Sequence, residues 1–432
     1  MLGLFMVIPV IAVTAVEYPD YSPLWVGLAI GGYGLTQALL QIPMGLWSDR
    51  IGRKPVIYVG LALFSLGSLI AGLADSMWLL TIGRILQGGG AIAGAVMALA
   101  SDVTRESQRT KIMAMIGVSI GLSFYLALLL GPFIASRLGL SGIFLITACL
   151  SILGILVVRF GVSQAPASHA TGDALPRVTQ LPQLFKHGHL WRLNVSVLII
   201  HMLITCFFVQ VPVRLIALGY PLSEHWLLYS IVLLVSVLCL IVMIKLVDKL
   251  KVALSFKIAL LFMATGFMLL IVQSPSWTGT LIAGILFFTG FNFLEAKMPA
   301  MISSIAPAGK KGSAMGIYAS HQFFGAFLGG LLSGLLNSYF SPSYTFMMCL
   351  LAIFLLSLVA KGLASVDKIK RVTLDISLLN TGPQAFEALR KALRAQSGVK
   401  EVVIDSTENA AYLKVDAKVF VLADAQDIVK NR

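Results

Sequence analysis

The stretch GLWSDRIGRKP, residues 45–55, places four charged residues within six positions, between long apolar runs. Positive charge at the end of an apolar segment is typical of a cytoplasmic anchor, but an anchor does not require the acid Asp49. Gly45 and Gly52 carry no side chains, so neighbouring backbone can approach them closely. We therefore expect Asp49 to dock on the N-terminus of another helix, where free N–H groups and the positive dipole end favour an anion.

The composition of the 432-residue chain indicates a polytopic membrane protein. Hydrophobic residues make up 58% of it, charged residues 12%, and the mean hydropathy is +0.91. A soluble domain carries about twice that charged fraction. The four cysteines are single residues in apolar runs with no CxxC pair, so neither a disulfide framework nor a metal site is predicted. No nucleophile–base set or nucleotide-binding loop is recognisable, which disfavours an enzyme, and we expect no cofactor.

Apolar runs predict twelve transmembrane spans, and the charges between them indicate the orientation. The spans lie near residues 2–16, 24–47, 55–74, 77–101, 111–135, 141–160, 193–216, 226–246, 253–273, 277–303, 313–337 and 343–362. The first begins at Met1 without a flanking cation, so we expect an N-terminal truncation of about one to three helical turns. Connections after even-numbered spans carry sixteen Lys and Arg residues, whereas the opposite connections carry two. This bias predicts that both termini are cytoplasmic and that the net charge of +13 follows the topology rather than nucleic-acid binding.

The chain divides into four predicted parts. Residues 1–160 and 193–362 form two six-helix bundles, joined by a cytoplasmic linker, 161–192, that is rich in Pro, Ser, Thr and Gly. The second half echoes the first where VDKLK (247–251) follows span eight as SDRIG (48–52) follows span two. Two six-helix halves related by an axis along the membrane normal are typical of one class of secondary transporters.

Residues 366–432 have a different character. VTLDISL (372–378) alternates like a strand, 383–396 is an amphipathic helix opened by proline, and 399–405 with 410–416 indicates a hairpin before a last helix. This βαββα order predicts a small α+β, ferredoxin-like cytoplasmic domain. It lacks a CxxC between its first strand and helix, so thiolate metal binding is disfavoured. Protein–protein contact, self-association, regulation by a small ligand and a passive stabilising role stay open.

Three motifs together resemble the major facilitator superfamily (MFS), and within it the drug:proton antiporters. Residues 45–55 fit the loop motif G-x-L-a-D-r-x-G-r-k, and RILQGGGAIAGAVMALASDVTRE (84–106) fits the Arg-x-x-Gln-Gly signature of the fourth helix. The tail sequence VKEVVIDSTENAAYLKVD resembles the extra domain of one subgroup. The glycine-rich motif of the fifth helix is degraded: Gly131 and Pro132 stand, but Ala135 and Ser136 replace its glycine pair.

The resemblance implies a conformational latch at the cytoplasmic rim. In the family, Asp49 would dock on the eleventh helix near 312–314, and Arg53 would pair with Asp102 at the end of the fourth, favouring the outward-open state. The alternative is a plain positive anchor, which is our interpretation of Arg50 and Lys54. The expected latch consists of Gly45, Asp49, Arg50, Gly52, Arg53, Lys54 and Asp102.

Ionisable residues inside apolar spans are functional candidates because burying them is costly. Arg84 has Gln87 one turn away and no acid nearby in sequence, so its partner must come from another helix. The resemblance suggests proton coupling or substrate orientation for Arg84; the alternative is a structural cation bound to carbonyls. Glu295 could take a proton in one conformation and release it in another, or be a structural acid. His201 and His321 could titrate near neutral pH or be hydrogen-bonded core residues.

Uncharged residues complete the candidate site. Tyr33, Gln37 and Gln41 share one helix face, and Asn292 shares another with Glu295, so all four are candidates to line a cavity. Small residues and a proline are expected to permit close helix packing. These packing residues are Gly88, Gly90, Gly94, Gly131 and Pro132.

The sequence predicts a proton-coupled secondary transporter of a bacterial inner membrane that exports small hydrophobic or cationic molecules by alternating access. One rival is uptake or facilitated diffusion, which the degraded fifth-helix motif allows. A second is a transporter-like receptor whose tail signals without flux. The expected partners are the lipid bilayer, protons and a small-molecule substrate, not nucleic acid, and we expect a monomer with the tail as its candidate contact surface.

Overall fold

The structure is a computed structural model that describes residues 1–104, 106–162, 181–247, 250–307, 310–363, 369–376, 383–405, 410–416 and 419–430. The helices of the first group are α1 (Leu2–Thr14), η1 (Ala15–Glu17), α2 (Pro23–Ile51), α3 (Arg53–Gly72), α4 (Met77–Gly88), α5 (Ala93–Asp102) and α6 (Glu106–Gly161). Those that follow are α7 (Leu181–Phe185), α8 (Gly188–Ala217), η3 (Leu222–Glu224), α9 (His225–Val247), α10 (Val252–Val272), α11 (Trp277–Ile305), α12 (Lys311–Tyr339) and α13 (Pro342–Ala360). The tail contains β1 (Ile369–Asp375), α14 (Pro383–Ala395), β2 (Val399–Asp405), β3 (Ala410–Asp416) and α15 (Leu422–Lys430).

Within these ranges, nine helical segments are long and apolar enough to cross a membrane. One of them, Lys111–Gly161, covers two predicted spans, because α6 consists of two helices that meet at Gly139, where φ 65° and ψ −175° are not helical. Residues 2–17 form a shorter apolar helix. A mainly helical protein with many apolar helices is therefore confirmed, whereas the number twelve stays a prediction.

The span predicted near 77–101 corresponds to one apolar segment long enough to cross a membrane, Met77–Ala100, which is made of two helices, α4 and α5. The break follows the glycine run 88–90. A methyl group on Gly90 would lie 2.5 Å from the carbonyl oxygen of Gly60, so α3 presses directly on this backbone. The Ile92 N–H then bonds the Gly90 carbonyl at 2.8 Å in place of a helical partner. Glycine permits both the contact and the break.

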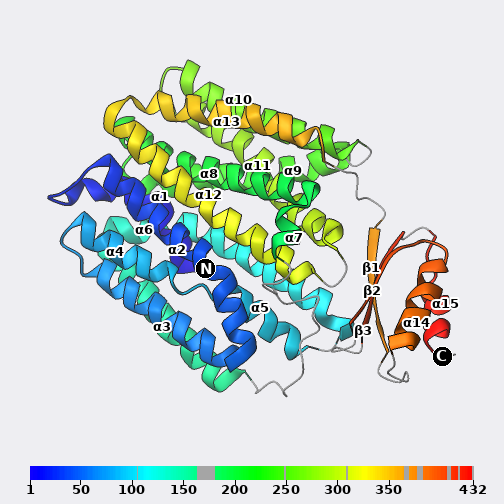
Figure 1. The fold of residues 1–432 in the computed structure, drawn as a ribbon. Helices are drawn as coiled ribbons and strands as arrows, with labels where there is room; N and C mark the ends of the chain where they lie inside the picture. Colours follow the sequence, from blue (N-terminus) through cyan, green and yellow to red (C-terminus); the bar gives the residue numbers. More distant parts are fainter. Residues whose placement is uncertain are drawn as a thin grey trace.

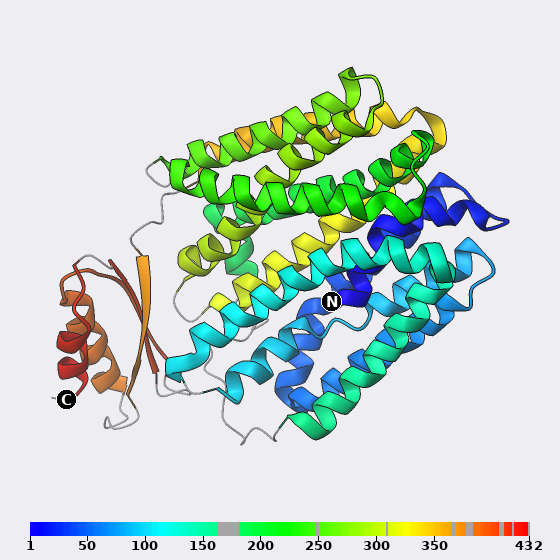
Figure 2. The same cartoon turned by 180° about the vertical axis from the view of Figure 1, so that it is seen from behind.

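The helices form two groups that lie side by side in Figures 1 and 2: an N-terminal group, α1–α6, and a C-terminal group, α8–α13. Each group has its own buried apolar cluster. Val7, Ile11 and Phe144 belong to the first, and Phe207 and Phe287 to the second. The phenylalanines of α8 and α11 are thus core residues.

Backbone contact between α2 and α12 joins the two groups. A methyl group added to Gly27 would overlap the carbonyl oxygen of Gly330, and one on Gly34 would lie 2.6 Å from that of Phe323. On the other side, a methyl group on Gly334 would lie 2.7 Å from the Pro23 carbonyl oxygen. Only residues without side chains allow two helices to approach this closely. The contact covers the first half of α2 and the second half of α12.

The tail is a three-stranded antiparallel sheet of order β1-β3-β2 with α14 and α15 on one face. Leu413 and Val415 of β3 point toward Leu389 and Leu393 of α14 in a buried cluster. The other face of the sheet lies toward the helix groups in both views (Figures 1 and 2). This arrangement agrees with the predicted α+β domain.

The first tail strand lies three residues earlier than predicted, at 369–375 instead of 372–378. β1 pairs with β3 from Ile369, opposite Asp416, to Asp375, opposite Ala410. The paired part of β1 therefore has the same seven-residue length as β3. The turn predicted at 406–409 and most of the predicted linker, 163–180, lie outside the described residues.

We expect Gly27→Ala to weaken the α2–α12 joint, because its methyl group would force backbone apart; overpacking of this kind costs about 1–3 kcal/mol. The apparent melting temperature in detergent should fall. Gly117→Ala on α6 is the matched control, since a methyl group there meets nothing within 4 Å. Equal melting temperatures for the two variants would contradict this account.

Candidate functional site

The first candidate site lies where α2 turns into α3. Gly52 separates the two helices with φ 97°, a conformation that favours glycine, and a Cβ there would meet only Pro55 Cδ at 3.7 Å. Our expectation that Gly52 serves a close backbone approach is therefore wrong; its role is the turn. The turn makes Arg53 the first residue of α3 and aims it back at α2.

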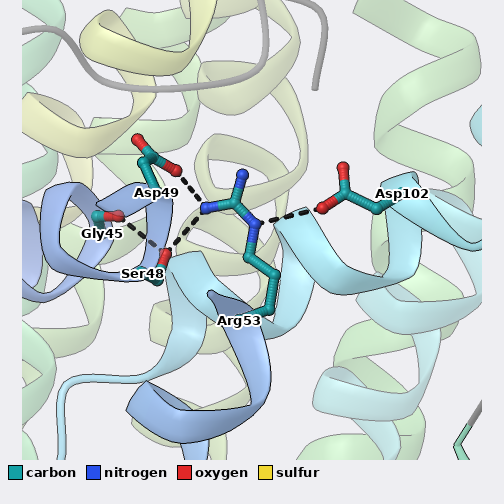
Figure 3. Close-up of polar contacts among 5 residues, drawn as sticks. All are labelled: Gly45, Ser48, Asp49, Arg53 and Asp102. Carbon is teal, nitrogen blue, oxygen red and sulfur yellow. Dashed lines mark hydrogen bonds and ion pairs between the residues drawn. The ribbon is translucent and has the colours of Figure 1, made fainter. Parts of the chain in front are cut away.

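Arg53 is the centre of an Arg53 cluster formed by Gly45, Ser48, Asp49, Arg53 and Asp102 (Figure 3). Its Nε donates to Asp102 Oδ2 at 3.1 Å, and its Nη1 donates to Ser48 Oγ at 2.8 Å and contacts Asp49 Oδ1. Ser48 in turn donates to the Gly45 carbonyl at 2.7 Å. The side chains of Arg53 and Asp102 are only 10% and 8% exposed. One guanidinium thus ties α2, α3 and α5 together through charge-assisted hydrogen bonds.

The other charges of this stretch behave differently. Lys54 Nζ donates to the Val162 carbonyl at 2.6 Å, just beyond the end of α6, so this lysine has a specific partner and is not only an anchor. Arg50 is exposed, as an anchor would be. Docking of Asp49 on the start of α12 stays a prediction.

The second candidate site is the Arg84 cluster: Ala29, Tyr33, Ser68, Arg84 and Gln87. Arg84 is 1% exposed; its Nε donates to the Ala29 carbonyl at 3.0 Å and its Nη1 to Gln87 Oε1. Gln87 Nε2 donates to Ser68 Oγ at 2.7 Å. The partner from another helix that Arg84 needs is thus a carbonyl on α2, and no acid pairs with it among the described residues.

Tyr33 covers this cluster. The Arg84 guanidinium carbon lies 4.9 Å from its ring centroid, in cation–π geometry. The same ring meets Phe323 of α12 edge-on, with centroids 6.3 Å apart. Tyr33 therefore connects the buried cation of the N-terminal group to the C-terminal group. Gln37 and Gln41, expected to line a cavity, are buried and bonded to each other at 3.0 Å.

The third candidate site is the His201 cluster, in which α8, α11 and α12 contribute His201, Glu295 and Gln322. His201 Nδ1 lies 3.1 Å from the Val197 carbonyl oxygen, which can only accept, so Nδ1 carries the proton. The other ring nitrogen, Nε2, lies 2.7 Å from Gln322 Nε2 and 3.8 Å from Glu295 Oε2. Gln322 Nε2 also donates to Glu295 Oε1 at 3.4 Å. The neutral ring therefore accepts from Gln322 through Nε2, and the Glu295 carboxylate lies within ion-pair distance of the same nitrogen.

Two other residues that we predicted to act with His201 and Glu295, namely His321 and Asn292, have different hydrogen-bond partners. His321 is not part of the His201 cluster: its Nδ1 donates to the Ile317 carbonyl at 2.8 Å and its ring lies near Phe185. Asn292 meets Ser236 on α9 at 3.4 Å. Sequence reasoning missed Gln322, although an amide side chain in the middle of an apolar helix, beside a histidine, was the available signal.

The predicted packing residues lie at helix contacts of unequal closeness. A methyl group on Gly88 would overlap the Tyr33 carbonyl, and one on Gly131 would lie 2.6 Å from the Met6 carbonyl, so α6 packs directly on α1 next to Pro132. The contact at Gly94 is less close, because a methyl group there would lie 3.7 Å from Gln41 Nε2.

Two family models match the chain. One described as Major Facilitator Superfamily matches residues 1–296 and 258–394. One described as the YajR YAM domain matches residues 381–431, which cover the tail from α14 onward.

Individual proteins agree with these matches. The chain is 40% identical over 422 residues to the inner membrane transport protein YajR of Escherichia coli (strain K12), covering 97% of this chain and 92% of that protein. It is 36% identical over 135 residues to the class B tetracycline resistance protein of Escherichia coli, covering 31% and 33%. A solved mutant of the nucleoside transporter NupG matches with TM-score 0.64 at 12% identity, over 84% of this chain and 98% of that one, which shows a shared fold.

We expect Asp102→Asn to lower stability and change the conformational balance, because it removes the ion pair that holds α5 to α3. Hydrogen bonds to charged groups of this kind contribute about 1–3 kcal/mol. The measurements are the apparent melting temperature and the labelling rate of an introduced cysteine at the end of α5. Arg50→Gln, at an exposed position, is the control and should match the native protein. If the two variants behaved alike, Arg53 would be an anchor and not the centre of a latch.

Proposed function

The chain belongs to the Major Facilitator Superfamily, and on this premise we propose that it is a proton-coupled secondary transporter that exports small hydrophobic or cationic compounds. Its family and relatives are transporters and not enzymes. Export is supported by the similarity to a tetracycline resistance protein, and an inner-membrane location by the similarity to YajR.

Twelve spans with both termini in the cytoplasm are part of this proposal. The bias of sixteen cations to two supports the orientation. In that topology, residues 23–34 of α2 and 323–334 of α12 lie at the outer side. We infer that the glycine contact between them closes the outer side, as in an inward-facing state. Alternating access then consists of opening this joint while the inner ends of the two groups approach.

The observation that carries the proposal is the His201–Glu295 contact. With His201 neutral, Nε2 accepts from Gln322, and the carboxylate retains a hydrogen bond from the same amide. A proton added to Nε2 displaces the Gln322 N–H from this nitrogen, because two donors cannot face each other, and turns the contact with Glu295 into an ion pair across α8 and α11. Between apolar helices a lone charge is costly, so the charged imidazole is stable only while Glu295 stays beside it. Protonation and the relative position of these helices are therefore linked, which is the requirement for coupling.

The Arg53 cluster supports the proposed conformational change between the inward-facing and outward-open states. Arg53 holds α5 and the turn after α2 as one unit, which leaves Asp49 at the rim that would approach α12 in the outward-open state. Docking there adds a favourable contact to one state only, and such a difference shifts a two-state equilibrium.

We expect Glu295→Gln to abolish the effect of a pH gradient on transport, because glutamine keeps the hydrogen bonds but cannot carry a charge. The assay is efflux of ethidium, as the hydrophobic cation probe, from proteoliposomes with and without a pH gradient. Lys297→Gln, two residues away on α11, is the matched control and should retain gradient dependence.

Gradient dependence that survives in Glu295→Gln would exclude this residue as the proton carrier. Equal flux of the native protein with and without the gradient would favour a facilitator. No flux of ethidium or of any compound in a wider screen would favour the receptor alternative.

A further inference from the structure

The tail domain contacts the end of one particular transmembrane helix. Lys414 on β3 points away from α14 and α15, and its Nζ donates to the carbonyl oxygen of Ile305 at 2.8 Å. Ile305 is the last residue of α11. The lysine side chain is only 14% exposed, so the contact is enclosed and not a loose surface approach.

The chemistry of this contact is that of a helix cap supplied from another domain. The last carbonyls of a helix lack intrahelical partners and form the negative end of its dipole, so an ammonium group is well suited to them. Glu401, directly opposite Lys414 in the β2–β3 ladder, lies 3.9 Å from the ammonium and fixes its direction. The sheet therefore presents a positioned cation to α11.

The same lysine lies close to the start of a second helix. His187 is the N-cap residue of α8, and its ring lies 6.1 Å from that of His189, centroid to centroid. Lys414 and Glu401 are close enough to His187 to perturb its charge. One face of the sheet thus caps the end of α11 through Lys414 and acts electrostatically on the residue that precedes α8.

These are the two helices that carry the proposed coupling pair. His201 lies about 21 Å along α8 from His187, and Glu295 about 15 Å along α11 from Ile305, at 1.5 Å per residue. We propose that Lys414 makes the tail a clamp on the cytoplasmic ends of α8 and α11, so that docking of the tail holds the helices of the His201 cluster in one relative position. The consequence for transport rests on the proposed function, whereas the docking itself does not.

The clamp includes a group that responds to cytoplasmic pH. The charged and titratable groups that face His187 are His189 on α8, Lys414 on β3 and Glu401 on β2. Burial, helped by the charges of His189 and Lys414, lowers the pKa of His187 below its usual value, against the weaker raising effects of a backbone hydrogen bond and of Glu401. Of these groups only Lys414 and Glu401 belong to the tail, and Lys414 has the larger effect. Docking therefore favours neutral His187, so it is complete above the ordinary histidine pKa and weakens as pH falls below it. Acidification of the cytoplasm thus releases the clamp.

The docked state can be measured as a distance. In full-length protein with the native cysteines replaced by alanine, spin labels at exposed Ala385 on α14 and exposed Leu254 on α10 report the tail position by pulsed electron spin resonance. Lys414→Met should lower the ratio of docked to released tail about two- to fivefold at pH 7.5, the effect of a cation at a helix C-terminus. Lys414→Arg should restore it, and Lys391→Met, at an exposed position of α14, should leave it unchanged. A docked ratio unaffected by Lys414→Met, or lowered equally by Lys391→Met, would overturn the clamp.

The pH response has its own test. The docked ratio of the native protein should fall between pH 7.5 and pH 5.5, and His187→Gln should remove most of this fall. An unchanged fall in His187→Gln would overturn the role of this histidine. No substrate is needed, so docking that behaves as expected while gradient-driven ethidium flux is absent would contradict the transport proposal alone. With flux intact, Lys414→Met should change its dependence on cytoplasmic pH while Lys391→Met does not.

Discussion

A charge between apolar helices is stable only where a partner is held beside it, and this constraint organises the polar interior of the protein. Arg84 meets it with a carbonyl, an amide and an aromatic ring. His201 and Glu295 meet it with each other and with Gln322. The difference matters for function. The partners of Arg84 belong to the N-terminal group and can move with it as one body. The His201 cluster takes one residue from each of three helices, so a shift of any of these helices changes the distances between its polar groups.

The contact between α2 and α12 gives these clusters a mechanical connection. Glycines bring the two backbones together, and the same approach carries Tyr33 onto Phe323, the residue after Gln322. The ring that covers Arg84 thus rests on the helix that contributes to the His201 cluster. Any motion that separates α2 from α12 changes the surroundings of both clusters at once, and no direct contact between their charges is needed for one to sense the other.

The same constraint applies where the tail meets the end of α11. Its helices cover one face of the sheet with apolar residues, which leaves Lys414 and Glu401 on the opposite face, toward the helix groups. A small domain that caps a helix end can bias the position of that helix at low energetic cost, because it acts on carbonyls that are unsatisfied in any case. Regulation of this kind requires no ligand site in the tail itself.

The sequence alone determined the membrane class, the family, the α+β tail and the identity of Arg53, Asp102, Arg84, His201 and Glu295 as residues to examine. It could do so because apolar runs, strand alternation and charges in apolar surroundings are local patterns. Each has a predictable free energy of burial wherever it occurs in a chain. Only the tertiary structure decided what each charge meets: a carbonyl for Arg84, Gln322 rather than His321 beside Glu295, and Ile305 for Lys414. It also decided that the glycine run divides the fourth predicted span into two helices and that Gly52 serves a turn. These outcomes depend on which helices approach one another and at what height, and helices that are distant in sequence are brought together by packing that no local pattern encodes.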